Sequence, residues 1–195
     1  MDHNEFMAFY TKNLFPFLES KETAAIRRVI EENPGAKDYL INNTHFGPEQ
    51  HANWGSSYLA PLQRAVVLSS VETAKLLVED LDVNVDSIQT MIKIKMPRDN
   101  GYDYPRLTQP DYKGSWTSLH LAVFKDDLPM VETLLELGAD ESIGGNINRI
   151  QFNNAMDLAK KLRNTKIVEA FEKTGLFGEF QAATAGPCAF SLFQH

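Results

Sequence analysis

The sequence predicts an all-α repeat solenoid, in which helix–turn–helix units stack on one another, with one extended β-hairpin-like insertion. Three observations favour this class. Residues 115–142 read as two short amphipathic helices joined by a turn. Similar stretches occur at residues 60–84 and 154–175. A unit of this size buries its apolar faces only against neighbours of the same kind.

The stretch SWTSLHLAVFKDDLPMVETLLELGADES, residues 115–142, is the strongest unit. Thr117 suits the N-cap of a first helix, and Pro129 suits the first turn of a second helix. Gly138 allows the positive φ that ends the second helix. The residues expected to form the apolar faces are Leu119, Ala122, Val123, Met130, Val131, Leu134 and Leu135.

The other two units align with this one. In APLQRAVVLSSVETAKLLVEDLDVN, residues 60–84, Ala65 matches Ala122. In NAMDLAKKLRNTKIVEAFEKTG, residues 154–175, Ala159 occupies the same place. The helix–turn–helix pattern therefore recurs along the chain.

The unit at 115–142 closely resembles the ankyrin repeat, a family unit of about 33 residues with a T-P-L-H-x-A opening. The matching residues are Thr117-Ser118-Leu119-His120-Leu121-Ala122, Val131, Leu134-Leu135 and Gly138-Ala139-Asp140. The resemblance implies stacked helix pairs whose concave side binds proteins. It also implies that His120 braces the turn by hydrogen bonding.

The whole chain, residues 1–195, is expected to form one ankyrin-repeat domain. Its expected parts are a divergent capping helix pair at 1–35, a repeat at 58–85, an insertion at 86–114, a repeat at 115–145, a terminal repeat at 153–175 and a tail at 176–195. The N-terminal pair lacks the T-P-L-H pattern, which suits a cap with a polar outer face. A long connection is expected from Pro34 to Tyr58.

The insertion at 86–114 lengthens the distance between neighbouring repeats. Leu62 and Leu119 are 57 positions apart, against about 33 in ideal repeats. Apolar and basic residues alternate from Met91 to Met96, and Asp99-Asn100-Gly101 is a turn signal. We expect a projecting β-hairpin. The alternative is a surface insertion without function, because longer loops cost little entropy.

Composition limits the classes of partner. The chain has 19 Lys and Arg against 26 Asp and Glu, a net charge of -7. With no Lys/Arg cluster expected, this acidity argues against nucleic acid and anionic membranes as partners. No apolar run is long enough for membrane insertion. Cys188 is the only cysteine, which fits a reducing, cytoplasmic location.

No catalytic, metal or cofactor site is expected. Cys188 lies in the tail without a neighbouring base, so it does not read as a nucleophile. His45 and His51 are six positions apart in an expected loop, which is not a zinc-ligand spacing in a helix. The sequence therefore predicts a protein that is not an enzyme.

The candidate protein-binding residues follow from the resemblance and from the insertion. They are Leu59, Val67, Leu68, Tyr102, Tyr104, Trp116, Phe124, Lys125, Asn153, Lys161 and Leu162. Trp116 and Phe124 are the strongest candidates, because a large aromatic side chain near an exposed turn is either covered or used in binding. Packing against a neighbouring repeat is the alternative for Leu59 and Val67.

The expected function is protein–protein interaction, as an adaptor or as a host-targeting effector acting in the host cytosol. The partner is expected to be a protein of unknown identity. The alternative is a scaffold or targeting segment of a larger assembly, or a homo-oligomer that pairs through the aromatic tail. Phe177, Phe180, Phe190 and Phe193 are the aromatic residues of that tail.

Overall fold

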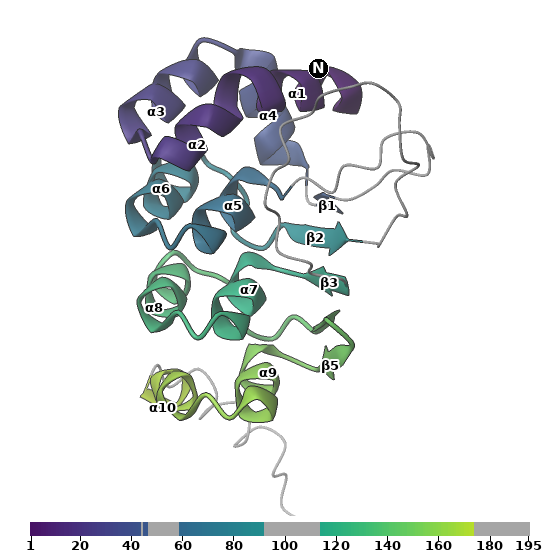
Figure 1. Ribbon diagram of the computed structural model, residues 1–195, viewed down its shortest axis with the longest axis vertical. Coiled ribbons are helices and arrows are strands. Elements are labelled where there is room, and N and C mark those ends of the chain that lie inside the picture. Colours follow the sequence, from purple (N-terminus) through teal and green to yellow (C-terminus); the bar gives the residue numbers. More distant parts are fainter. Residues whose placement is uncertain (44, 47–58, 92–113, 174–195) are drawn as a thin grey trace, which may run out of the picture.

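The computed structural model describes residues 1–43, 45–46, 59–91 and 114–173. Helix pairs lie one above another along the long axis of the molecule (Figure 1). We call the pairs the first to fourth layers. They are α2/α3 (Phe15–Ser20 and Thr23–Glu31), α5/α6 (Pro61–Val67 and Val71–Lys75), α7/α8 (Ser118–Phe124 and Leu128–Glu136) and α9/α10 (Ala155–Leu162 and Thr165–Lys173). The described residues are therefore mostly helical and fit a helical repeat, as expected.

The same tight turn joins the two helices of every layer. Its central residue is left-handed, with φ of 58° at Lys21, 50° at Ser69, 57° at Asp126 and 61° at Arg163. In each turn this residue donates its N–H to the carbonyl three positions back, and the next residue donates to the carbonyl five positions back, at 2.9–3.2 Å. These two bonds satisfy carbonyls that the helix end would leave unpaired. The N-terminal pair therefore has the same backbone geometry as the three units found in the sequence.

Additional helices complete the first layer. They are α1 (His3–Phe9), the π-helix η1 (Tyr10–Leu14) that continues into α2, and α4 (Pro34–Asn42). The expected loop from Pro34 is thus wrong for residues 34–42. Pro34 begins α4, Ala36 and Leu40 are buried, and the Tyr39 ring stacks on Phe6 with 4.2 Å between centroids. The packing against α1 makes this short segment helical.

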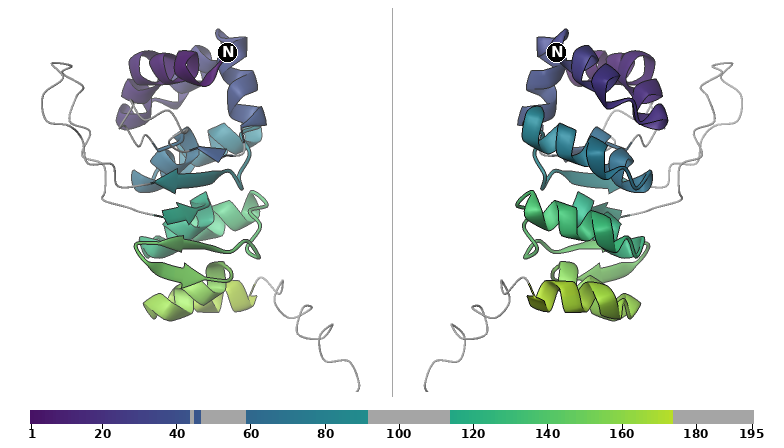
Figure 2. Two further views of the ribbon diagram at one scale, coloured as in Figure 1. Left: turned by 90° about the vertical axis from the view of Figure 1, so that its right-hand side faces the viewer. Right: turned by 90° about the vertical axis from the view of Figure 1, so that its left-hand side faces the viewer.

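A second π-helix, η2 (Leu76–Asp80), extends α6 on the outer side of the second layer. Figure 2 shows the layers from the strand side and from the helix side, with the second helices together on the latter. Ion pairs connect these outer helices between layers. Arg27 of α3 pairs with Asp80 of η2, and Lys75 of α6 lies 3.9 Å from Glu136 of α8.

Five short strands on the other side of the helices form one sheet, so the prediction of an all-α fold is incomplete. The strands are β1 (His45–Phe46), β2 (Ile88–Met91), β3 (Gly114–Trp116), β4 (Gly145–Ile147) and β5 (Ile150–Phe152), in this spatial order. The connections between layers lie side by side and pair through their backbones. β1 and β2 are parallel, and the other neighbours are antiparallel.

The two ends of the predicted insertion are paired strands. Thr90 of β2 lies opposite Ser115 of β3, and Met91 lies opposite Gly114. Gly114 has a φ of 130°, and an added Cβ would lie 2.2 Å from the Asn146 carbonyl oxygen, so only glycine fits there. Residues 92–113, which include the predicted hairpin turn and most of the alternating segment, lie outside the described residues.

The left-handed turns provide a test of the shared geometry. A side chain in the left-handed region costs about 1–2 kcal/mol, and glycine avoids this cost. We therefore expect Lys21→Gly to raise the free energy of unfolding by about 1 kcal/mol, part of the relief being offset by the greater freedom of glycine in the unfolded chain. Urea denaturation would measure the gain, provided that the dependence of the unfolding free energy on urea concentration is the same for both proteins.

Lys21→Ala is the matched control, because it removes the charge but keeps the Cβ. It should leave the stability close to that of the wild type. An equal gain for both variants would show that the charge of Lys21, rather than its backbone conformation, destabilises the turn.

Candidate protein-interaction surface

The candidate surface is built from the last residues of the four first helices. The turn geometry places Val67 and Leu68 of the second layer level with Phe124 and Lys125 of the third, and with Lys161 and Leu162 of the fourth. Each of these helices contacts the first helix of the next layer. The equivalent positions therefore lie side by side across the stack.

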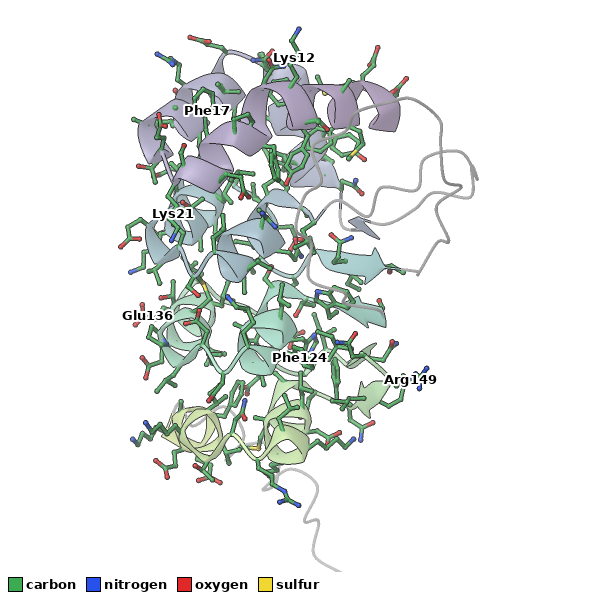
Figure 3. The ribbon with its side chains drawn as sticks, viewed as in Figure 1. Lys12, Phe17, Lys21, Phe124, Glu136 and Arg149 are labelled. Atoms are coloured by element: carbon green, nitrogen blue, oxygen red, sulfur yellow. The ribbon has the colours of Figure 1, made fainter. Side chains whose placement is uncertain are left out.

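We call these equivalent positions the row. The first layer adds Glu19 and Ser20 to it, two residues that the sequence did not indicate. These residues precede Lys21 as Val67 and Leu68 precede Ser69. The N-terminal pair lacks the T-P-L-H opening and has no glycine in its turn. The backbone hydrogen bonds, rather than a residue pattern, identify the two positions. Figure 3 labels Phe17 of α2, the helix that carries Glu19 and Ser20, and Phe124 of the third layer.

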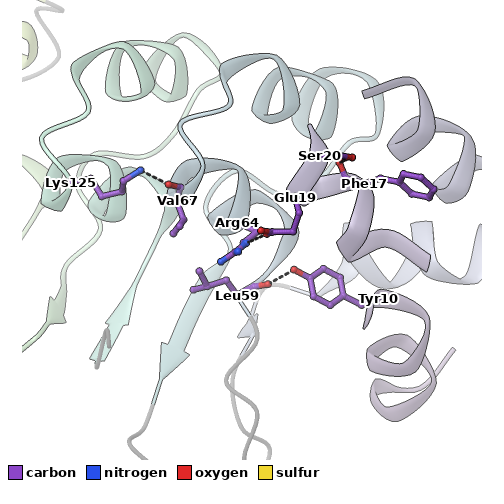
Figure 4. A network of polar contacts seen from close by, with 8 residues as sticks. All are labelled: Tyr10, Phe17, Glu19, Ser20, Leu59, Arg64, Val67 and Lys125. Atoms are coloured by element: carbon purple, nitrogen blue, oxygen red, sulfur yellow. Dashed lines mark hydrogen bonds and ion pairs between the residues drawn. The ribbon is translucent and has the colours of Figure 1, made fainter. Parts of the chain in front are cut away.

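Two of the predicted binding residues are buried. Leu59 is 2% exposed and Trp116 is 1% exposed, so neither side chain is available to a partner. Of the two outcomes open for Trp116, covered or used in binding, the structure shows that it is covered. Trp116 ends β3 opposite Gln89 and belongs to the core. The Leu59 carbonyl accepts a 2.9 Å hydrogen bond from the Tyr10 hydroxyl, which ties it to the first layer (Figure 4).

The remaining candidates differ in their exposure. Val67, Leu68, Phe124 and Leu162 are partly buried, whereas Asn153 and Lys161 are exposed. Tyr102 and Tyr104 lie outside the described residues. Within the described segments, Met1 is the only large hydrophobic residue classed as exposed. The described candidates therefore present partly covered, rather than fully exposed, apolar side chains.

The two lysines of the row take part in bonds within the protein. Lys125 donates from Nζ to the carbonyls of Val66 and Val67, both at 2.7 Å, and so binds the end of α5 in the preceding layer (Figure 4). Burial lowers the pKa of the Lys125 ammonium, while the charge of Asp127 opposes that shift. Lys161 donates to the Gln151 carbonyl at 2.6 Å and to Asp157 at 2.8 Å.

A buried cation lies between the first and second layers. Arg64 takes the place that Leu121 and Leu158 occupy in the later layers, and its side chain is only 5% exposed. It forms an ion pair with Glu19, and its guanidinium lies 5.3 Å from the centroid of the Phe15 ring (Figure 4). The ion pair and the ring compensate part of the cost of burying this charge.

His120 has a structural role, as the family resemblance implies. Its Nδ1 accepts a hydrogen bond from the Thr117 N–H at 3.0 Å, so its Nε2 carries the proton and donates to the Ile143 carbonyl at 2.9 Å. Burial lowers the pKa of His120 to about 4. The imidazole is therefore neutral at pH 7, and both of its nitrogens are used in bracing the repeat.

Other residues replace this histidine in the neighbouring layers. Gln63 occupies the equivalent position of the second layer and donates from Nε2 to the Ser87 carbonyl at 2.9 Å. In the fourth layer the position is Asp157, whose carboxylate accepts from the Asn153 N–H at 2.9 Å. The hydrogen bond to Lys161 is the main cause that lowers the pKa of Asp157.

Two carboxyl groups near the third-layer connection have pKa values raised by burial. They are Asp86, which accepts a 2.9 Å hydrogen bond from the Asp140 N–H, and Glu141, which is next to Asp140 in the chain. No group of three His, Cys, Asp or Glu in the described part of the chain is arranged to hold a metal ion. His51 and Cys188 lie outside that part.

Comparison with known proteins identifies the third layer. Residues 115–146 match the family model for the ankyrin repeat, so this segment, which contains α7 and α8, is an ankyrin repeat. The resemblance recognised from Thr117 to Asp140 is thereby confirmed. Compared with curated proteins and with solved structures, the chain has no match. Ankyrin repeats generally mediate protein–protein interaction and are generally not catalytic.

None of the helices in the described segments is both long and apolar enough to cross a membrane.

The buried histidine predicts a dependence of stability on pH. Between the ordinary pKa of 6.5 and the folded value of about 4, the unfolded chain binds a proton at His120 and the folded chain does not. Lowering the pH through this window should therefore remove about 3 kcal/mol of stability, at 1.36 kcal/mol per pKa unit. Thermal denaturation from pH 7 to pH 4 would measure the loss.

His120→Gln is the matched control, because Gln63 already makes the equivalent bond in the second layer. The variant lacks the titrating imidazole, so the difference in stability between the wild type and the variant should change across this window in favour of the variant. A difference that stays constant with pH would contradict the assignment of the acid sensitivity to His120.

The buried arginine predicts a coupling between two layers. Glu19→Ala leaves the Arg64 charge without its carboxylate, and because Glu19 is about one-third exposed we expect a loss of only about 2 kcal/mol. Arg64→Leu restores the residue type of the later layers, and in that background Glu19→Ala should be nearly neutral. Equal losses in both backgrounds, measured by urea denaturation, would show that the two side chains do not interact.

Proposed function

We propose that this chain is a non-catalytic protein-interaction module of the adaptor type, and that it binds a protein partner through the row formed by its first helices. The observation that supports the proposal most directly is the ankyrin repeat at 115–146. The repeated turn supports it further, because it aligns equivalent side chains of four layers on one surface.

The proposed contact residues follow from exposure along the row. Val67, Leu68, Phe124 and Leu162 are partly accessible, and Ser20 is accessible at the first-layer end of the row. Asn153 is also exposed, but it precedes α9 and lies outside the row. Partly exposed aliphatic and aromatic side chains, once covered by a partner, contribute through desolvation. Tyr102 and Tyr104 of the insertion are a second proposed contact, supported by the sequence alone.

The domain organisation belongs to the same proposal. We take the chain as one ankyrin-repeat solenoid, in which α2/α3 with α1 and α4 forms the N-terminal cap and α9/α10 the terminal repeat. The shared turn of Lys21, Ser69, Asp126 and Arg163 supports this reading. A cytoplasmic location fits proteins that contain ankyrin repeats and a chain with one cysteine.

A charge placed in the row should abolish binding without unfolding the protein. The test variant is Val67→Glu/Leu162→Glu, in which two partly buried side chains of the first helices are replaced. Affinity capture from cell extract, read by mass spectrometry, should lose at least one protein that the wild-type chain retains. We expect the affinity for that protein to fall by about tenfold or more, as for interface residues worth over 1 kcal/mol.

The matched control is Val78→Glu/Val168→Glu, in which partly buried valines of the outer helices in the same two layers are replaced. Circular dichroism would verify that both double variants remain folded to the same extent. If both lose the same proteins, or if neither does, the row is not the binding surface.

A further inference from the structure

A cluster of positive charge lies at the turn between α9 and α10. The segment KKLRNTK, residues 160–166, has four cations in seven positions, so the expectation of a chain without a Lys/Arg cluster is wrong for this segment. Lys160, Lys161, Arg163 and Lys166 are all exposed. The turn at Arg163 places the end of α9 next to the start of α10. We call Lys160, Arg163 and Lys166 the basic turn.

Among the described residues, no side chain of the basic turn is in an ion pair, whereas Lys161 is bound to Asp157 and Gln151. The charge of Lys160 helps to lower the pKa of Asp157, but that carboxylate is hydrogen-bonded to Lys161. Asn164, in the middle of the turn, donates its side-chain amide to the Val123 carbonyl at 2.9 Å and so belongs to the packing between layers. The cations therefore do not stabilise the fold by pairing.

Helix electrostatics explain only part of this arrangement. Lys160 lies in the last turn of α9, where a positive charge is favourable. Lys166 lies in the first turn of α10, which has no acidic residue. A positive charge at a helix N-terminus is unfavourable by about 0.3–1 kcal/mol. The local structure thus opposes the charge that the sequence places there.

The charge of the fourth layer is opposite to that of its neighbour. Residues 149–173 contain six Lys and Arg against three Asp and Glu, a net charge of +3. Residues 114–148 contain one Lys against six Asp and Glu, a net charge of -5. An extended polyanion or an anionic membrane would meet the acidic third layer as well as the basic turn. A short anionic segment, confined to the fourth layer, avoids that repulsion.

We infer that the basic turn docks a short Asp/Glu-rich segment of a protein partner. The inference rests on the proposed function in one respect, because the partner is the protein that lies along the row of first helices. The turn is at the fourth-layer end of that row, directly after Lys161 and Leu162. Carboxylates of the segment pair with Lys160, Arg163 and Lys166, while its neutral residues extend toward Leu162.

The test uses the full chain and a labelled oligoglutamate peptide in a fluorescence anisotropy titration. We expect binding that weakens as salt is added. The triple variant Lys160→Gln/Arg163→Gln/Lys166→Gln should bind about tenfold more weakly, since three exposed ion pairs contribute about 0.2–1 kcal/mol each. Unchanged affinity, or no binding by the wild type, would overturn the proposal.

The matched control removes three exposed cations elsewhere, with Lys12→Gln/Arg28→Gln/Arg149→Gln. Arg149 belongs to the same layer but projects from the β4–β5 turn on the strand side (Figure 3). This variant carries the same net charge as the test variant and should bind the peptide like the wild type. Equal weakening of both variants would show a nonspecific effect of total charge and overturn the proposal.

Two further probes separate the class of anion. Single-stranded oligothymidylate and phosphatidylserine vesicles should bind more weakly than the peptide, because each also faces the acidic third layer. Tighter binding of either, lost in the triple variant, would overturn the assignment to an acidic protein segment. The row is tested separately by capture with Val67→Glu/Leu162→Glu. If the row captures a partner but the basic turn binds no peptide, this inference is refuted and the proposed function is not.

Discussion

In each layer, two backbone hydrogen bonds close the turn between the helices, and the stacking of the whole molecule depends on that closure. The bonds hold the helices of a pair antiparallel, so that their apolar sides face the next layer. A single pair exposes too much of this surface to be stable alone. Closure at Lys21, Ser69, Asp126 and Arg163 gives four helix pairs with the same turn, and this shared geometry lets each pair pack against the next.

The parts of the fold that could be predicted are those whose causes are local. Thr117 and Pro129 act at helix starts, and Gly138 takes the positive φ expected of it. The sheet could not be predicted, because most of its strands pair with residues that are distant in the sequence. The helix α4 was missed for a similar reason, since its packing depends on Phe6, which is distant in the sequence. The sheet and α4 both depend on contacts between residues that are distant in the sequence.

The candidate surface was predicted in part. The family pattern gave the correct positions on the first helices, but it could not give exposure, which depends on the strands beside them. Trp116 is covered because β3 pairs with β2 and directs its last side chain into the core. At Gln63 and Asp157 the structural role is kept although the residue type differs. They replace the bracing histidine by other hydrogen bonds, so a motif based on residue names recognises the third layer more readily than its neighbours.

Two of the first helices are bound at their ends by side chains of the next layer. Lys125 of the third layer satisfies the last carbonyls of α5, and Asn164 of the fourth layer satisfies the Val123 carbonyl of α7. In both cases the donor is supplied from further along the chain. The Val66 and Val123 carbonyls also accept from the Ser69 and Asp126 N–H groups of their own turns. The ends of α5 and α7 are therefore held twice, once by a local bond and once by a side chain of the following layer. A chain that stopped before the fourth layer would keep the turn bond at Val123 and lose the bond from Asn164.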